Sequence, residues 1–127
     1  MSSVVLDSSA LLAAILGEPG AERVEAHLTS ASMSAVNLSE VAAKAVERGY
    51  QLDGVIAELS RLSIEYVPFD ADLAYVAASL RLATRHIGLS LGDRACLALG
   101  LKTGLPVLTA DRAWASVDLG VNVDIIR

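Results

Sequence analysis

Short apolar runs alternate with longer helical patterns along this 127-residue chain, and this alternation constrains the fold more than any other feature. Runs typical of buried or half-buried strands lie at 4–6, 31–35, 64–69, 106–109 and 121–126. Helical patterns lie between them, at 9–16, 21–28, 38–48, 52–62, 70–85 and 92–102, with a helical turn at 111–116. Such alternation favours a sheet with helices on both faces. The sequence therefore predicts one domain over residues 1–127, of the α/β class, with three layers (α/β/α) and a central, mainly parallel sheet.

The composition narrows the function classes. Hydrophobic residues make up 54% of the chain and charged residues 20%, which excludes a disordered protein. Only 4% of the residues are aromatic, so a base-stacking surface is not expected. The net charge of −5 argues against a passive nucleic-acid coat. It is compatible with an enzyme that reaches phosphate through cations held by carboxylates.

Cysteine usage and hydropathy indicate in which cellular compartment the protein works. Cys96 is the only cysteine, so no internal disulfide can form, and its apolar surroundings at 95–99 predict a buried, inert thiol. The apolar stretch at 11–16 is not preceded by Lys or Arg, and no run approaches the roughly 18 residues needed to cross a membrane. We expect a soluble, cytoplasmic protein.

Acidic residues stand where the predicted strands end and where the predicted helices begin. Asp7 and Asp111 directly follow strand patterns, and Asp70 looks the same, whereas Glu40 and Asp93 stand at helix starts. In open parallel sheets, ligands bind at the carboxyl ends of the strands, near the switch in strand order. We therefore expect four or five carboxylates from distant parts of the chain to converge there.

Each acid alone also has an ordinary structural explanation. The segments 37–40 and 90–93 both match capping boxes, and Glu40 precedes Lys44 by four residues, as in a helical ion pair. Simple N-caps would account for the other acids, which are Asp7, Asp70 and Asp111. Spacing alone does not decide between caps and a cluster.

A cluster of carboxylates has a cost that caps do not have. Two carboxylates about 4 Å apart repel each other by roughly 4 kcal/mol at an effective dielectric constant near 20. Several acids at one edge therefore need protons or a divalent cation to stay together. Ligands that are all oxygen suit Mg²⁺ or Mn²⁺ rather than Zn²⁺. His27 and His86 lack the spacing of a ligand pair, and no second cysteine exists for a sulfur site.

Four segments of the chain resemble a PIN domain and, more narrowly, the VapC-type toxins of bacterial toxin–antitoxin pairs. These segments are VVLDSSALLA at 4–13, MSAVNLSEV at 33–41, GLSLGDRACLA at 88–98 and VLTADRAW at 107–114. They span nearly the whole chain, in the order and spacing of the family. No acid of the pattern is missing, so nothing suggests an inactive member.

The resemblance implies a PIN-like (Rossmannoid) fold. It also implies an endoribonuclease that depends on Mg²⁺ or Mn²⁺. Such an enzyme would inhibit translation by cleaving an RNA, either tRNA or rRNA. Its catalytic and metal-binding residues would be Asp7, Glu40, Asp93 and Asp111, accompanied by the hydroxyls of Ser9 and Thr109. Three of the acids, Asp7, Asp93 and Asp111, would hold one or two metal ions. Glu40 would orient the attacking water or bind the second ion. Attack by an external water would leave a 5′-phosphate and a 3′-hydroxyl.

The resemblance also implies a cognate antitoxin whose tail covers a groove and the active site, within a homodimer and a toxin–antitoxin hetero-oligomer. Apolar residues that either form this groove or pack in the core are Leu11, Leu12, Ile15 and Leu16. Two other functions remain open: a PIN nuclease that processes RNA without an antitoxin, and a non-catalytic α/β interaction module such as a response-regulator receiver. A receiver needs an acidic pair just before the strand-end Asp, where this chain has Ser2 and Ser3.

Overall fold

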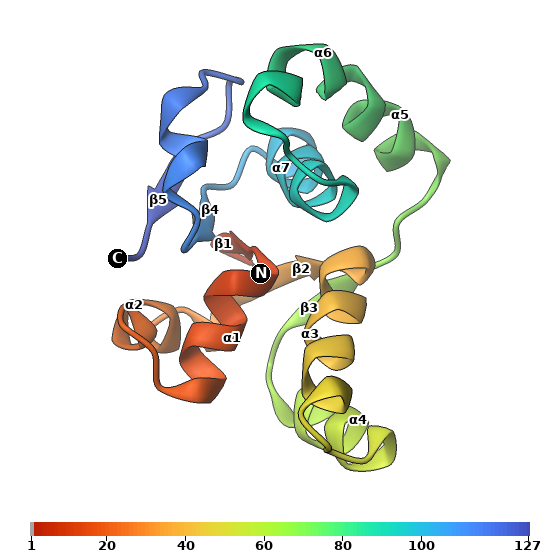
Figure 1. Cartoon of the computed structure of the whole chain (residues 1–127), viewed down its shortest axis with the longest axis vertical. Coiled ribbons are helices and arrows are strands. Elements are labelled where there is room, and N and C mark those ends of the chain that lie inside the picture. The colour runs from red at the N-terminus through yellow and green to blue at the C-terminus, as the bar shows by residue number, and fades with distance from the viewer. Residues whose placement is uncertain (1) are drawn as a thin grey trace.

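A five-stranded parallel sheet forms the centre of the molecule in the computed structural model, which describes residues 2–127 (Figure 1). The strand order is β3-β2-β1-β4-β5, and every neighbouring pair is parallel. The strands are β1 (Val4–Leu6), β2 (Ala31–Ser34), β3 (Glu65–Val67), β4 (Val107–Thr109) and β5 (Val123–Ile125). The prediction of a three-layer α/β fold with a mainly parallel sheet is confirmed.

Helices cover both faces of the sheet. They are α1 (Ser8–Leu16), α2 (Ala21–Glu25), α3 (Ala35–Glu47), α4 (Leu52–Arg61), α5 (Ala71–Ser79), α6 (Arg81–Thr84) and α7 (Leu91–Thr103). Three 3₁₀ turns accompany them, at Leu28–Ser30, Arg85–Ile87 and Arg112–Ser116. Residues of α1 to α4 pack with Val4 and Leu6 of β1 in one core cluster, and α5 and α7 pack with Val5 in another. Successive strand residues point to opposite faces of the sheet. Because helices cover both faces (Figure 1), all three residues of β1 are buried.

The strand order reverses direction beside β1. The chain runs from β1 through β2 to β3 at one edge and then returns to place β4 and β5 on the other side of β1. Leu6 of β1 is in register with Leu108 of β4, and Asp7 N donates to Leu108 O at 2.9 Å. The carboxyl ends of β1 and β4 therefore flank the switch in strand order, where open α/β sheets bind their ligands.

Helix bounds differ from the sequence prediction by more than one residue, or by a break, at three places. Helix α3 begins at Ala35 rather than 38, because Ser34 Oγ accepts a bond from Val36 N and caps it one turn earlier. The predicted helix at 21–28 ends as an α-helix at Glu25. The predicted helix at 70–85 is divided at Leu80, a buried residue, into α5 and α6.

Several helix ends follow the sequence closely. Helix α7 ends at Thr103, one residue beyond the prediction, and Gly104 adopts the left-handed conformation (φ 73°) that glycine accepts without steric cost.

Cys96 of α7 is fully buried, and this burial raises the pKa of its thiol, as expected for an inert core cysteine. None of the helices in the described chain has the length and apolarity that crossing a bilayer requires.

Candidate active site

Asp7 lies at the carboxyl end of β1, next to the switch in strand order. Its carboxylate is buried, and two hydroxyls donate to the same oxygen, Oδ2: Ser9 Oγ at 2.6 Å and Thr109 Oγ1 at 2.9 Å. Although Asp7 occupies the N-cap position of α1, its side chain accepts no capping bond. Its second oxygen, Oδ1, is buried and has no hydrogen-bond partner among residues 2–127. A simple capping role therefore does not explain Asp7.

The electrostatics of Asp7 connect it to two of the other predicted acids. Burial raises the pKa of Asp7 from an ordinary 3.8 to about 6, although the bonds from Ser9 and Thr109 act in the opposite direction. The negative charges of Asp93 and Glu40 raise this pKa further. The structure thus brings three acids, from β1, α3 and α7, within electrostatic reach of one another.

Glu40 projects from α3 and is held by a neighbour on the same helix. Asn37 Nδ2 donates to Glu40 Oε1 at 2.9 Å and to Gly92 O of α7 at 3.0 Å. The capping box predicted at 37–40 is wrong, because Ser34 caps α3 and both residues lie inside the helix. The ordinary alternative of an ion pair with Lys44 is not formed either, because no salt bridge joins these two residues among residues 2–127.

Asp93 stands in the first turn of α7, where the predicted capping box is present. Asp93 Oδ2 accepts from Ser90 N at 2.9 Å, and Ser90 Oγ accepts from Asp93 N at 3.1 Å. Asp93 therefore combines two properties that the sequence offered as alternatives. It caps a helix, and its charge acts on Asp7.

Asp111 lies just beyond the carboxyl end of β4, at the surface of the molecule. It is exposed, and its Oδ1 accepts from Ala113 N at 3.0 Å in the turn that follows β4. Its backbone N donates to Thr109 Oγ1 at 3.1 Å, the same hydroxyl that binds Asp7. Asp111 is not one of the charges that raise the pKa of Asp7.

Asp70 is also exposed, beyond edge strand β3, and its Oδ1 caps α5 by accepting from Leu73 N.

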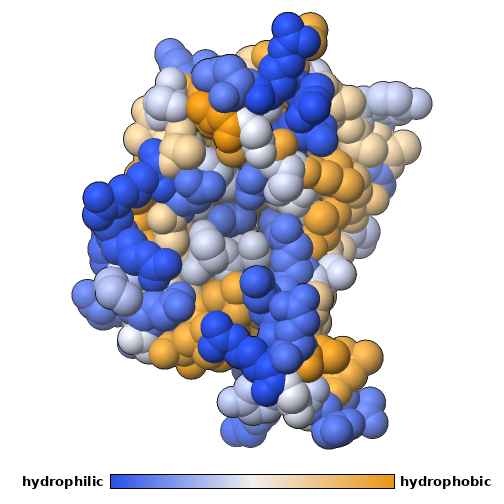
Figure 2. Space-filling view, in the orientation of Figure 1, coloured by the Kyte–Doolittle hydropathy of each residue, from blue (hydrophilic) through white to orange (hydrophobic). Residues whose placement is uncertain are grey.

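The four predicted acids share one arrangement. Within the described chain, each accepts protein hydrogen bonds through a single oxygen, which leaves its other oxygen for a further partner. No three His, Cys, Asp or Glu side chains among residues 2–127 are already gathered as a metal-binding group. The unsatisfied Oδ1 of Asp7 and the all-oxygen donor set nevertheless fit a hard divalent cation, which would neutralise the repulsion between the carboxylates. In Figure 2, the middle of the face seen in Figure 1 is hollowed and largely hydrophilic, with apolar patches around it.

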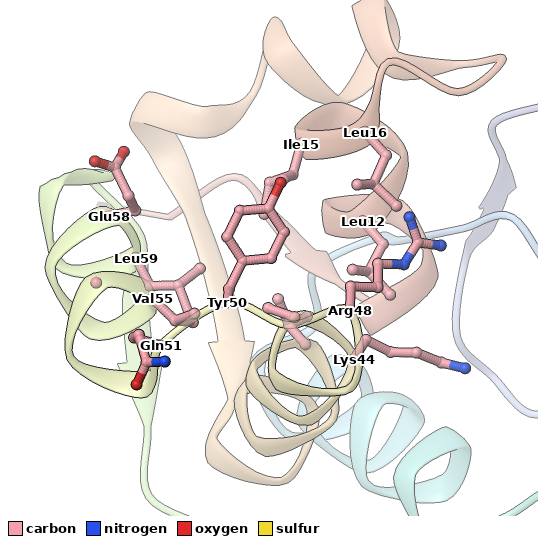
Figure 3. A pocket seen from close by; sticks show the side chains of 13 residues that line it. Leu12, Ile15, Leu16, Lys44, Arg48, Tyr50, Gln51, Val55, Glu58 and Leu59 are labelled. Carbon is pink, nitrogen blue, oxygen red and sulfur yellow. The ribbon is translucent and has the colours of Figure 1, made fainter.

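A second feature of the structure is an apolar groove. It has a volume of about 410 Å³ and is lined by α1, α3, the turn after α3, and α4. Figure 3 shows Leu12, Ile15 and Leu16 of α1 facing Tyr50 and Val55 across it. Two basic residues, Lys44 and Arg48, also line the groove. Of the four apolar residues assigned either to a groove or to the core, Leu12, Ile15 and Leu16 line this groove, whereas Leu11 is fully buried in the core.

The sequence interpretation missed the part played by Asn37. It assigned Asn37 to a helix cap, although the side chain joins Glu40 to α7 across 55 positions of the chain. A local signal was available, because Ser34 is an equally good cap and would place Asn37 and Glu40 on one helix face, three residues apart. The bond to Gly92 has no local signal.

Comparison with known proteins gives a consistent result. The model of the PIN domain family matches residues 4–119. No curated protein matches the sequence. Among solved structures, a toxin–antitoxin complex from Klebsiella pneumoniae is 21% identical with a TM-score of 0.77, covering 98% of both chains. DNA-bound VapBC from Salmonella typhimurium is 18% identical with a TM-score of 0.75, covering 100% of both chains. A sarcin–ricin loop cleaving VapC toxin from Mycobacterium tuberculosis is 16% identical with a TM-score of 0.70, covering 91% of this chain and 97% of that one.

Proposed function

The chain belongs to the PIN domain family, and we propose that it is an endoribonuclease dependent on Mg²⁺ or Mn²⁺ that acts as the toxin of a VapBC-type toxin–antitoxin pair. The observation that carries this proposal is the buried Asp7 carboxylate, which has an unsatisfied oxygen and lies within electrostatic reach of Glu40 and Asp93. A folded protein keeps such an arrangement at a cost in stability, and this cost is typical of functional sites.

The residues of the site would divide the work as follows. Asp7, Asp93 and Asp111 would hold the cation through the oxygens that protein hydrogen bonds leave available. Ser9 and Thr109 fix the orientation of the Asp7 carboxylate through its Oδ2. Glu40, held by Asn37, would orient the attacking water or bind a second ion. When bound, the cation lowers the pKa of water and screens the charge of the scissile phosphate. Attack by water would leave a 5′-phosphate and a 3′-hydroxyl.

The choice of RNA as substrate rests on the family and on chemistry. The protein carries a net charge of −5, so a nucleic acid would be attracted mainly by the cation and not by a basic surface. One structural neighbour is described as a toxin that cleaves the sarcin–ricin loop, which supports a structured RNA target. We propose that the target is rRNA or tRNA, that its cleavage inhibits translation, and that the protein acts in the cytoplasm.

We further propose that the groove between α1, α3 and α4 receives the antitoxin. Its apolar floor would take the apolar face of an amphipathic segment, while Lys44 and Arg48 would attract acidic residues on that segment. Neighbours solved as toxin–antitoxin complexes support a hetero-oligomer with an antitoxin. The toxin homodimer within it is proposed from the family resemblance. An RNA-processing PIN nuclease without an antitoxin is the alternative, and a gene for an antitoxin next to this one would decide against it. The family match leaves a receiver module without support.

The test is cleavage of end-labelled total tRNA and rRNA by the purified chain. We expect cleavage with Mg²⁺ or Mn²⁺, little cleavage with Ca²⁺, and none with excess EDTA. The Asp7→Asn protein, prepared in parallel, controls for contaminating ribonuclease. Cleavage undiminished by EDTA, or by Asp7→Asn, would contradict the proposal. Mapping of RNA ends in cells that express the chain would then identify the target.

A further inference from the structure

Asn37 is an unusual residue for its position. Its side chain is fully buried on α3, yet only its nitrogen is satisfied, by donating to Glu40 Oε1 and to Gly92 O. The amide oxygen, Oδ1, has no hydrogen-bond partner within residues 2–127. A buried polar atom without a partner destabilises a fold, whereas an apolar side chain of similar shape avoids that cost. Stability alone therefore does not explain an asparagine at this position.

Gly92 gives a second, independent observation at the same contact. A Cβ placed on Gly92 would lie 2.2 Å from Glu40 Oε2 and 2.5 Å from its carboxyl carbon. Gly92 is not one of the glycines with positive φ, so its backbone does not require glycine. The missing side chain instead lets the Glu40 carboxylate pack directly against the first turn of α7. Glycine is a poor helix former, so this close approach again comes at a cost to the helix.

The two observations concern the same atoms. Asn37 fixes one oxygen of Glu40 and the carbonyl of Gly92, while Gly92 leaves room for the other oxygen of Glu40. Gly92 directly precedes Asp93, and α3 packs on α7 although the two helices belong to opposite layers of the fold. The contact therefore sets where the Glu40 carboxylate lies relative to Asp93.

We propose that Asn37 is a positioning residue that, together with the close approach at Gly92, holds the Glu40 carboxylate in the catalytic cluster. This inference rests on the nuclease function proposed above. Asn37 itself touches neither cation nor RNA in this proposal, and its effect passes through Glu40. A merely structural brace between α3 and α7 would make the same two hydrogen bonds, so the test must separate the two roles.

The test is a double-mutant cycle between Asn37→Leu and Glu40→Gln, with two readouts: Mn²⁺ affinity by isothermal titration calorimetry and single-turnover RNA cleavage. In the wild-type background, we expect Asn37→Leu to weaken Mn²⁺ binding by about tenfold and cleavage by about 10- to 100-fold, as for residues that orient metal ligands. In the Glu40→Gln background, the same substitution should change either readout by less than about threefold, because the group through which it acts is altered. Equal effects in both backgrounds would overturn the proposal in favour of a brace.

Control variants keep the result interpretable. Thr84→Val removes another fully buried polar group, whose hydroxyl donates to Leu80 O, and should leave Mn²⁺ affinity unchanged. If Asn37→Leu does not fold, as judged by circular dichroism, Gly92→Ala displaces the Glu40 carboxylate without altering Asn37 and should show the same dependence on Glu40. A folded Asn37→Leu protein with unchanged Mn²⁺ affinity and unchanged cleavage would overturn only this inference. A wild-type protein that neither binds Mn²⁺ nor cleaves RNA would overturn the nuclease function as well.

Discussion

Asp7 and Asp70 occupy equivalent places in the fold and have opposite properties. Each follows a strand at the carboxyl edge of the sheet and stands at the N-cap of a helix. Asp70 is exposed and its carboxylate caps α5, whereas Asp7 is buried, caps nothing and keeps one oxygen without a partner. Asp7 lies at the centre of the sheet beside the switch in strand order, and Asp70 lies beyond an edge strand. Position in the strand order, and not the local sequence, distinguishes the buried Asp7 from the exposed, capping Asp70.

The largest expected effect concerns the Asp7 side of this comparison. In the proposed function, Asp7→Asn should lower the single-turnover cleavage rate about a thousandfold or more, since it would remove a metal ligand that contributes several kcal/mol to transition-state stabilisation. The metal-free protein should melt no earlier than wild type, because a buried charge is lost while Oδ1 of the amide still accepts from Ser9 and Thr109. Calorimetry and cleavage of the same preparation measure both effects. A large drop in melting temperature together with retained cleavage would assign Asp7 to the scaffold.

Asp111 lies between the two extremes. Its carboxylate caps a turn, as in Asp70, but its backbone shares the Thr109 hydroxyl with Asp7. We expect Asp111→Ala to lower cleavage by about a hundredfold, as a metal ligand at the rim of the site would. Single-turnover cleavage on protein shown to be folded by circular dichroism measures this loss. A rate within threefold of wild type would place Asp111 with Asp70 among the capping acids.

The raised pKa of Asp7 predicts how stability depends on pH. Because this pKa is about 6 in the folded protein and 3.8 ordinarily, the folded state binds more protons between these values. The metal-free protein should therefore lose up to about 3 kcal/mol from this group as the pH rises from about 4 to 6, and no more above that range. Urea unfolding of wild type and Asp7→Asn across this range isolates the contribution as a difference. A difference that does not change with pH would show that Asp7 titrates normally.

The smallest effect belongs to Asp70. Asp70→Ala should lower the free energy of unfolding by about 1 kcal/mol through loss of the N-cap of α5. The cleavage rate should stay within a few-fold of wild type, since the site lies elsewhere. Urea unfolding and single-turnover cleavage test the two halves separately. Loss of cleavage in a folded Asp70→Ala protein would mean that Asp70, and not only Asp7, belongs to the active site.

The sequence predicted those features that depend on neighbouring residues. The strand at 4–6 and the capping box of Ser90 and Asp93 are present because apolar runs and capping side chains act locally. The sequence also named the hydroxyls of Ser9 and Thr109 through a family resemblance, and the structure places both on Asp7.

Features that depend on distant contacts were missed. The break between α5 and α6 has no glycine or proline. At this point, Arg94 of α7 donates to Ala77 O, a carbonyl near the end of α5. The bond from Asn37 to Gly92 likewise joins two helices that no local pattern connects. The cap of α3 was misplaced by one turn because two capping residues, Ser34 and Asn37, compete within four positions, and tertiary packing selects the first.

The hydrogen bond between Thr109 and Asp7 spans 102 positions, and this separation has a consequence for the order of events during synthesis. A ribosome exposes Asp7 early, but the hydroxyl that orients it, and the strand that supplies this hydroxyl, emerge 102 residues later. The helices bearing Glu40 and Asp93 must also dock from opposite sides of the sheet before their carboxylates meet. A nascent chain therefore lacks the bond that orients Asp7 until β4 has emerged. In the proposed function, a growing toxin would not cleave RNA before β4 has emerged and paired with β1.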